Sequence, residues 1–175
     1  GDPEARFGED PVRVLRAVRF SESLNFKIAG FTDVQLRKYG AQLRHIPPAR
    51  LFVEMDKLFL RGFASRNFRR LRELGLLSHL LPFEGCGQTP QSNSVREDFL
   101  ESALSSTDTR VMEGGSVTLG FLIAVFLWFP LKMQIEKLSK FGNVRAEDFV
   151  SAEELILLTQ LKKVAIPRRV TRSVR

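Results

Sequence analysis

The 175-residue chain is poor in the residues that build disulfides and zinc sites, with one cysteine and two histidines. A single cysteine excludes an intramolecular disulfide framework and fits a reducing compartment. Structural zinc sites need several Cys and His ligands, so we expect no metal site in these residues. The sequence also lacks internal repeats, low-complexity tracts and a glycine-rich phosphate loop.

A long apolar run is missing as well. The most apolar stretch, residues 119–131, is well short of the ~20 residues that cross a bilayer. We therefore expect a buried core helix there, with Trp128 supplying volume and Pro130 ending or kinking it. No signal peptide is visible. These features lead us to expect no membrane span and a cytoplasmic location.

Negative charge is in short supply. The chain has 20 acidic and 27 basic residues, a formal net charge of +7 and a pI near 10.1. This balance suits an anionic partner, and RNA is the simplest one, although charge alone does not separate RNA from a membrane surface. A hydrophobic content of 43% supplies a core for one domain or two small helical lobes.

The spacing of apolar residues is helical throughout, so we expect an all-α fold. Leu51, Met55 and Leu58 follow the 3,4 pattern of a buried stripe on a helix opened by Pro47 and Pro48. A loop with Gly, Pro, Ser and Asn is expected to separate two lobes. The loop covers residues 84–94, a turn is expected at 107–110, and the other helices span 11–24, 32–43, 64–74, 95–105, 119–131, 135–141, 152–161 and a stretch after 167.

Two acids precede a helix that carries Arg13, Arg16 and Arg19 at intervals of three. Asp10 is a preferred N-cap residue and a proline follows it, so we expect the helix to begin here. Adenine and cytosine each present an exocyclic amine beside an unprotonated ring nitrogen. A carboxylate accepts from the amine and a guanidinium donates to the nitrogen. One Asp and one Arg a helical turn apart would therefore admit A and C and reject G and U.

The same spacing also fits an ordinary surface helix. Its acids would favour the positive end of the helix dipole, and its arginines would be solvated or paired with nearby carboxylates such as Glu9 and Glu22. The spacing of these residues alone supports the two interpretations equally.

Longer blocks favour the first interpretation. The run GDPEARFGEDPVRVLRAVRF, residues 1–20, resembles the nucleotide-recognition motif of the class II nucleotidyltransferases, the family of bacterial poly(A) polymerases and CCA-adding enzymes. Four more blocks resemble the poly(A) polymerase branch: IPPARLFVE (46–54), STDTRV (106–111), FLIAVFLWFPL (121–131) and VAIPRRVT (164–171). The resemblance implies helical neck and body lobes. Residues 1–24 would end the nucleotide motif and form the first neck helix, 25–84 the RNA-binding neck, and 85–175 the body.

Carried over by position, the resemblance makes Glu9, Asp10 and Arg13 the residues that fix and read the incoming base, with Arg16 and Arg6 orienting the pocket or contacting triphosphate. In this family a catalytic head with paired metal-binding aspartates precedes the motif. We expect the chain to begin after that head and to stop before the family's end. It would then hold no catalytic residue, the head would bind Mg²⁺, ATP would be the substrate, and this chain alone would be inactive.

A basic helix face follows the motif. Its arginines are either solvated or, as the resemblance implies, hold the RNA 3′ strand through sequence-tolerant backbone contacts. Arg50 and Glu54 are one turn apart and are expected to form a surface ion pair of roughly 0.3 kcal/mol. A second basic cluster is expected at Arg168, Arg169, Arg172 and Arg175. The predicted RNA-binding residues are Lys57, Arg61, Arg66, Arg69 and Arg70.

Together these features predict part of a bacterial polynucleotide adenylyltransferase, which adds AMP from ATP to RNA 3′ ends. RNA-decay or helicase proteins are expected as further partners. Two alternatives stay open. One is a CCA-adding tRNA nucleotidyltransferase, which shares the base-reading motif. The other is a non-catalytic helical RNA-binding or adaptor module.

Overall fold

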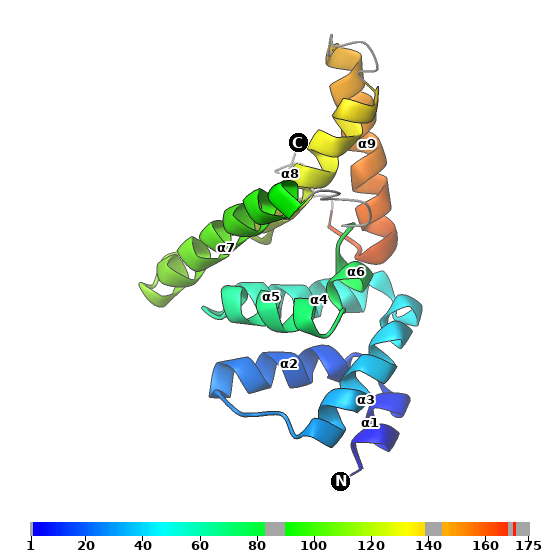
Figure 1. Cartoon of the computed structure of the whole chain (residues 1–175), viewed down its shortest axis with the longest axis vertical. Coiled ribbons are helices and arrows are strands. Elements are labelled where there is room, and N and C mark those ends of the chain that lie inside the picture. Colours follow the sequence, from blue (N-terminus) through cyan, green and yellow to red (C-terminus); the bar gives the residue numbers. More distant parts are fainter. Residues whose placement is uncertain (1, 83–89, 139–144, 168–169, 171–175) are drawn as a thin grey trace.

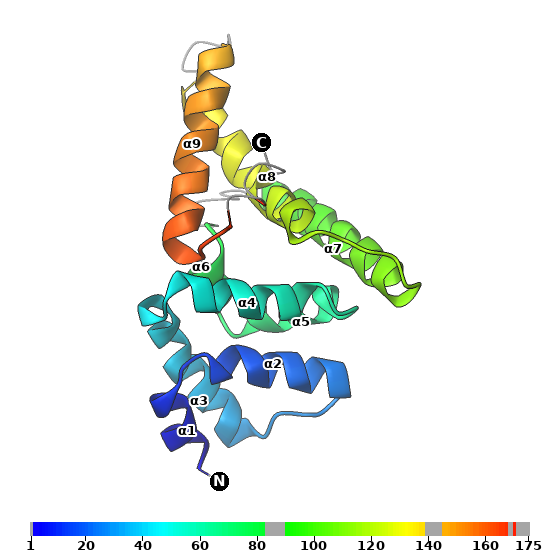
Figure 2. The same ribbon diagram turned by 180° about the vertical axis from the view of Figure 1, so that it is seen from behind.

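A computed structural model describes residues 2–82, 90–138, 145–167 and 170. These residues form α-helices and one 3₁₀-helix and no strand, which confirms the all-α prediction. Figures 1 and 2 show an elongated molecule in which α1 to α6 form one end, α7 projects sideways, and α8 and α9 form the other end. The helices are α1 (Pro3–Glu9), α2 (Arg13–Leu24), α3 (Gly30–Gly40), η1 (Ala41–His45), α4 (Pro48–Phe59), α5 (Ala64–Glu73), α6 (Leu77–Leu80), α7 (Pro90–Met112), α8 (Leu119–Leu138) and α9 (Ala146–Lys163).

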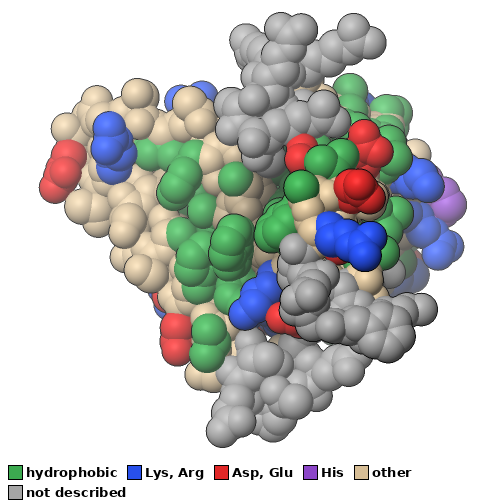
Figure 3. All heavy atoms as spheres, turned by 90° about the horizontal axis from the view of Figure 1, so that it is seen from above, with side chains coloured by type: hydrophobic (Ala, Val, Ile, Leu, Met, Phe, Trp, Pro, Cys, Tyr) green, Lys and Arg blue, Asp and Glu red, His purple; other side chains and the backbone are tan. Residues whose placement is uncertain are grey.

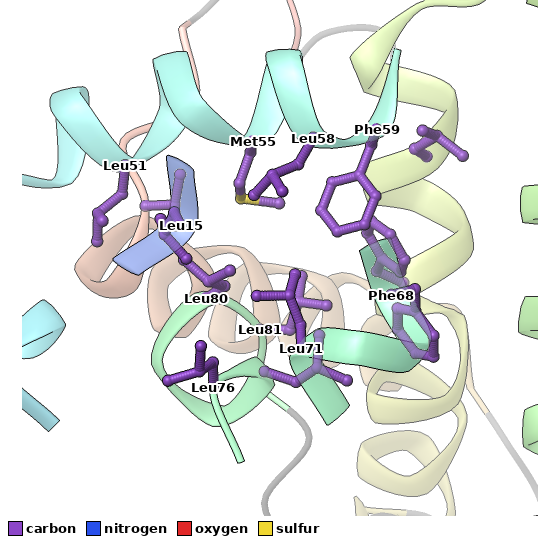
Figure 4. Packing of buried hydrophobic residues seen from close by; sticks show 14 of the residues in the cluster. Leu15, Leu51, Met55, Leu58, Phe59, Phe68, Leu71, Leu76, Leu80 and Leu81 are labelled. Carbon is purple, nitrogen blue, oxygen red and sulfur yellow. The ribbon is translucent and has the colours of Figure 1, made fainter. Parts of the chain in front are cut away.

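One apolar cluster runs through these helices and holds them together. In Figure 4 the stripe of α4, with Leu51, Met55 and Leu58, points toward side chains from α2, α5 and α6. These three residues are at most 1% exposed, as the sequence pattern predicts. The stripe therefore packs α4 against both α2, which carries part of the nucleotide motif, and the basic helix α5, and these two helices also contact each other.

α7 is longer and more regular than predicted. Residues 90–94 are helical, and the helix passes through 107–110 without a turn, so both predictions were wrong. The hydroxyls of Thr107 and Thr109 donate to the carbonyls one turn earlier, at Ala103 (2.9 Å) and Ser105 (3.1 Å). These bonds satisfy the polar side chains within the helix.

α8 continues through Pro130 to Leu138 and absorbs most of the separately predicted helix at 135–141. Pro130 thus does not end it. Trp128 is 53% exposed, so its predicted place in the core was wrong, whereas Leu122 and Phe126 are buried. By length and mean hydropathy (1.5) α8 is apolar enough to cross a membrane, a test that core helices of folded proteins also pass, and 44% of that stretch is buried inside the molecule. Figure 3 shows that some hydrophobic side chains stay on the surface of the face seen from above.

Several boundaries also differ from the predictions. α1 was not predicted, α3 begins and ends earlier than expected, and α9 begins at Ala146, where Asp148 accepts from the Arg145 N–H (2.9 Å). Most of the expected loop at 84–94 lies outside the described residues, as do Arg168, Arg169, Arg172 and Arg175 of the second basic cluster.

Candidate nucleotide and RNA interface

The predicted nucleotide motif forms a corner between α1 and α2. Asp10 is the extended residue (φ −146°) that ends α1, and its side chain accepts from the Val12 N–H (3.3 Å). Its carbonyl accepts from the Arg13 N–H (3.0 Å), so the first turn is tighter than an α-helix and α2 begins at Arg13, two residues later than predicted. This turn fixes Asp10 beside the start of α2.

Arg13 pairs with Glu9, as the surface-helix interpretation predicts, whereas Asp10 pairs with a residue that is distant in sequence. Arg13 donates to Glu9 (3.3 Å), and Arg6 approaches the same carboxylate (3.5 Å). Asp10 instead accepts from Arg50 on α4, with both carboxylate oxygens 3.1 Å from one guanidinium nitrogen. Glu9, Arg6 and Arg13 therefore form one cluster, and Asp10 joins a residue that we had not assigned to the pocket.

Glu54 is the buried anchor of this region. Its side chain is 3% exposed and accepts from Arg16 (3.1 Å) and from Lys57 (3.4 Å), while its second carboxylate oxygen is buried without a hydrogen-bond partner in the described structure. The predicted Arg50–Glu54 surface pair was thus wrong. The sequence held the relevant signal, because Glu54 falls on the same stripe as Leu51, Met55 and Leu58.

The corner keeps hydrogen-bonding capacity for a base. An ionised carboxylate offers about four lone-pair sites, and Arg50 occupies only part of those of Asp10. The Arg13 guanidinium has five N–H donors. One of its nitrogens donates to Glu9, and the Arg13 side chain is 37% exposed. An acceptor at Asp10 and a donor at Arg13 match the amine and the ring nitrogen of adenine or cytosine.

The predicted RNA-binding residues lie on α4, on α5 and, in the case of Arg61, on the segment that joins them, but most of them are neutralised. Arg66 pairs with Glu22 (3.4 Å), Arg69 with Glu101 (3.1 Å), and Arg70 with Asp33 and Glu73. Lys57 faces Glu54, and among the described residues Arg61 has no ion pair. Surface pairs of this kind are worth 0 to ~1 kcal/mol, so a phosphate can compete for these cations.

Two of these arginines line a hollow of about 450 Å³ between the end of α2 and α5. Asn25 turns the chain there in the left-handed conformation (φ 54°) and accepts from Arg66 (2.9 Å). Lys27 and Phe26 complete the hollow, and Phe26 is 68% exposed. Glu22 and Glu73 also line the hollow and pair with its two arginines. An exposed ring beside cations suits a single strand, because a base stacks on the ring while its phosphate competes for the cations. Our sequence reasoning missed Phe26 and Lys27.

A metal site is not apparent here. Across the described ranges no group of three His, Cys, Asp or Glu side chains could hold an ion. The resemblance places Mg²⁺ in the head that would precede these residues, so no step of the chemistry below is assigned to a metal in this chain.

Comparison with known proteins places the neck in a family. Residues 25–83 match the family described as "Probable RNA and SrmB- binding site of polymerase A". Over the whole chain the sequence is 36% identical to "Poly(A) polymerase I" of Haemophilus influenzae. The chain is thus similar over its whole length to the polymerases of the poly(A) polymerase and CCA-adding enzyme family. The matched neck contains Arg50, Glu54 and the predicted RNA-binding residues.

The relatives differ in how much of this chain they match. The Haemophilus polymerase aligns with 100% of this chain, which spans 39% of that protein, and "Poly(A) polymerase I" of Escherichia coli O6:H1 aligns with 98% at 36% identity, which spans 37%. "CCA-adding enzyme" of Anoxybacillus flavithermus is 40% identical, but over only 46% of this chain. The chain therefore spans less than two fifths of its polymerase relatives, and the similarity to them continues into the body helices.

Proposed function

We propose that this chain is the base-selecting and RNA-holding part of a bacterial polynucleotide adenylyltransferase, which adds AMP from ATP to RNA 3′ ends in the cytoplasm. The observation that carries the proposal is the similarity to poly(A) polymerase I over the whole chain, combined with an Asp10–Arg13 corner that keeps an acceptor and a donor for adenine. Residues 1–24, 25–84 and 85–175 would serve as motif, neck and body.

In this proposal Asp10 accepts from the adenine amine and Arg13 donates to the adjacent ring nitrogen. Arg50 holds Asp10 in place, and Glu9 holds Arg13. Guanine presents a carbonyl and an N–H at the equivalent atoms, so it would set acceptor against acceptor and donor against donor. Arg16 and Arg6 would face the triphosphate, and the buried Glu54 would orient Arg16.

The RNA strand would cross the hollow at the end of α2. Phe26 would stack a base, and Arg66, Arg70 and Lys27 would meet phosphates after releasing their carboxylates. The family description names SrmB as well as RNA, so we also propose that residues 25–83 contact a protein partner of the RNA-decay or helicase type.

The experiment is an extension assay on the parent protein that contains this chain. The protein is incubated with Mg²⁺ and either a generic RNA or a tRNA lacking its terminal CCA, with ATP, CTP or both. A long A tail on generic RNA supports the proposal. No extension of either RNA would overturn it.

A CCA-adding function is the second candidate, because 46% of the chain is 40% identical to a CCA-adding enzyme. The base edge does not separate the two, since cytosine has the same amine and ring-nitrogen order as adenine. In the same assay, tRNA growth that stops after C, C and A would establish this function instead.

A further inference from the structure

A second cationic hollow lies at the other end of the neck. It has a volume of about 250 Å³, and α6, α9 and the segment that joins η1 to α4 surround it. At ~30 Å³ for each water in the liquid, it has room for about eight water molecules. Its polar lining consists of Arg44, Ser78, His79, Lys162 and Lys163.

The hollow is held in shape by contacts between distant parts of the chain. Lys163 donates to the Ser78 carbonyl (2.7 Å), and the Ala165 N–H donates to the Pro48 carbonyl (3.1 Å). Gln160 is buried and donates to the Leu80 carbonyl (2.9 Å). These bonds fix the last turn of α9 against α6 and the start of α4, so the cations meet in the folded chain although they are far apart in sequence.

Within the described part of the chain, Arg44 and Lys162 of this hollow lack the carboxylate partners that the arginines of α5 have. Among the described residues no ion pair involves Arg44, His79 or Lys162, whereas Arg66, Arg69 and Arg70 each have a carboxylate. Burial lowers the pKa of His79, and the positive charges of Lys163 and Arg44 lower it further. The histidine thus lies in a positive potential.

Lysines in the last turn of a helix often do no more than offset its dipole. That role does not account for this cluster, because Lys163 bonds to α6 rather than to the end of α9, and Arg44 and His79 come from other elements. Lys163 is fixed by its bond to α6. Lys162 and Arg44 are exposed, and Arg44 donates to the ring of His45 (3.0 Å). Three cations around a polar hollow favour a compact anion.

We propose that Arg44, Lys162 and Lys163, beside His79, bind a phosphate group of the RNA backbone. The choice of RNA as the source rests on the proposed function, whereas the phosphate chemistry rests on the cluster itself. The hollow adjoins Pro48 in the first turn of α4, and Arg50 in the same turn holds Asp10. A strand whose end reaches the Asp10 corner would thus have a phosphate anchored at the same end of α4.

The test combines RNA affinity with the titration of His79. In the 175-residue chain, the double variant Arg44→Ala/Lys162→Ala should raise the Kd for a fluorescent oligo(A) strand about five- to tenfold at low salt. It should also flatten the log–log salt slope by up to about 0.7, the value for the loss of one phosphate contact on a single strand. The control Lys132→Ala/Lys137→Ala removes the same charge from exposed positions on α8 and should leave both quantities nearly unchanged.

NMR titration reports on the site itself, because a bound phosphate should raise the pKa of His79. The His79→Gln variant identifies its signal. An upward shift with oligo(A) supports the proposal. A shift with inorganic phosphate but not with oligo(A) would overturn RNA as the source of the phosphate. The site itself would be overturned if neither ligand shifted the pKa of His79, or if the two double variants lost the same affinity for oligo(A). The extension assay on the parent is a separate readout, so failure of one proposal is distinguishable from failure of the other.

Discussion

At the scale of single residues, Glu54 links the neck to the nucleotide motif. It is a buried carboxylate on an apolar stripe, and it meets Arg16 from α2 and Lys57 from its own helix. Removing a charge of this kind leaves its partners without their acceptor, and hydrogen bonds to charged groups contribute about 1.5 to 3 kcal/mol. The half-exposed state of Arg16 and Lys57 reduces this cost, because water can solvate them.

Glu54→Gln should therefore lower the free energy of unfolding by about 1 to 2 kcal/mol. Urea unfolding measures it, and an unchanged m value shows that stability alone has moved. Glu97→Gln is the matched control, since Glu97 forms an exposed pair with Arg72 (3.1 Å) and should cost at most ~0.5 kcal/mol. Equal effects of the two variants would show that Glu54 is no anchor.

His79 makes stability depend on pH. Its pKa is lowered in the folded chain by burial and by Lys163 and Arg44, so the unfolded chain binds a proton more readily. The contribution of His79 is fully present above its ordinary pKa of 6.5 and is lost as pH falls toward its folded pKa. Unfolding midpoints from pH 8 down to about pH 5 should fall more steeply for the wild-type chain than for His79→Gln. Parallel curves would contradict this.

At the scale of elements, the body helix α7 caps the neck helix α5. Asp108 accepts from the N–H groups of Ala64 (2.6 Å) and Ser65 (3.0 Å), which begin α5. α5 has no cap from its own N-cap residue, Phe63, so this carboxylate satisfies two donors that the helix leaves open. The contact ties the two predicted lobes together at the helix that carries the basic face.

Asp108→Ala should destabilise the chain by about 1 to 2 kcal/mol, the cost of losing an N-cap. Chemical unfolding measures the change in the free energy of unfolding. Hydrogen exchange at Ala64 and Ser65 shows whether the lost cap is at the start of α5, because their N–H groups should lose protection. Asp98→Ala on the same helix removes an exposed carboxylate with a long contact to Ser94 (3.5 Å) and should change little. Unchanged exchange at α5 in Asp108→Ala would exclude the cap.

The local sequence pattern predicted which helices form better than it predicted where they end or which residues they contact. The stripe on α4 and the glycine that ends α5 were readable, because Gly75 adopts a positive φ (74°). The continuity of α7 and α8 was not, because the residue types at 107–110 and Pro130 favour breaks. In the structure Thr107 and Thr109 bond within the helix, and Pro130 is buried inside α8. The partner of Asp10 could not be predicted from the sequence either. Arg50 is 40 residues away, and only the packing of α4 on α2 brings it close.

At the scale of the whole molecule, the net charge of +7 is unevenly distributed, because the cations of some regions are paired with carboxylates and those of others are not. The arginines of α5 are largely offset by carboxylates from α2, α3 and α7, while the hollow around Arg44 and Lys162 keeps its positive charge. The hollow combines residues of the stretch 25–83, which matches the RNA-binding family, with Lys162 and Lys163 of α9 outside that stretch. In our proposal an RNA strand contacts both regions, and Asp10 and Arg13 select the base at the start of α2.

The measurement that tests this account most directly is the nucleotide preference of the parent protein with Arg13→Ala. We expect kcat/KM for ATP to fall by about 1 to 3 kcal/mol in transition-state terms, and the preference for ATP over GTP to shrink, because the donor to the ring nitrogen is lost. Arg72→Ala, which removes an exposed arginine from α5, should leave the ratio unchanged. An unaltered ATP preference in Arg13→Ala, in a protein that still extends RNA, would contradict the base-selecting role of this corner.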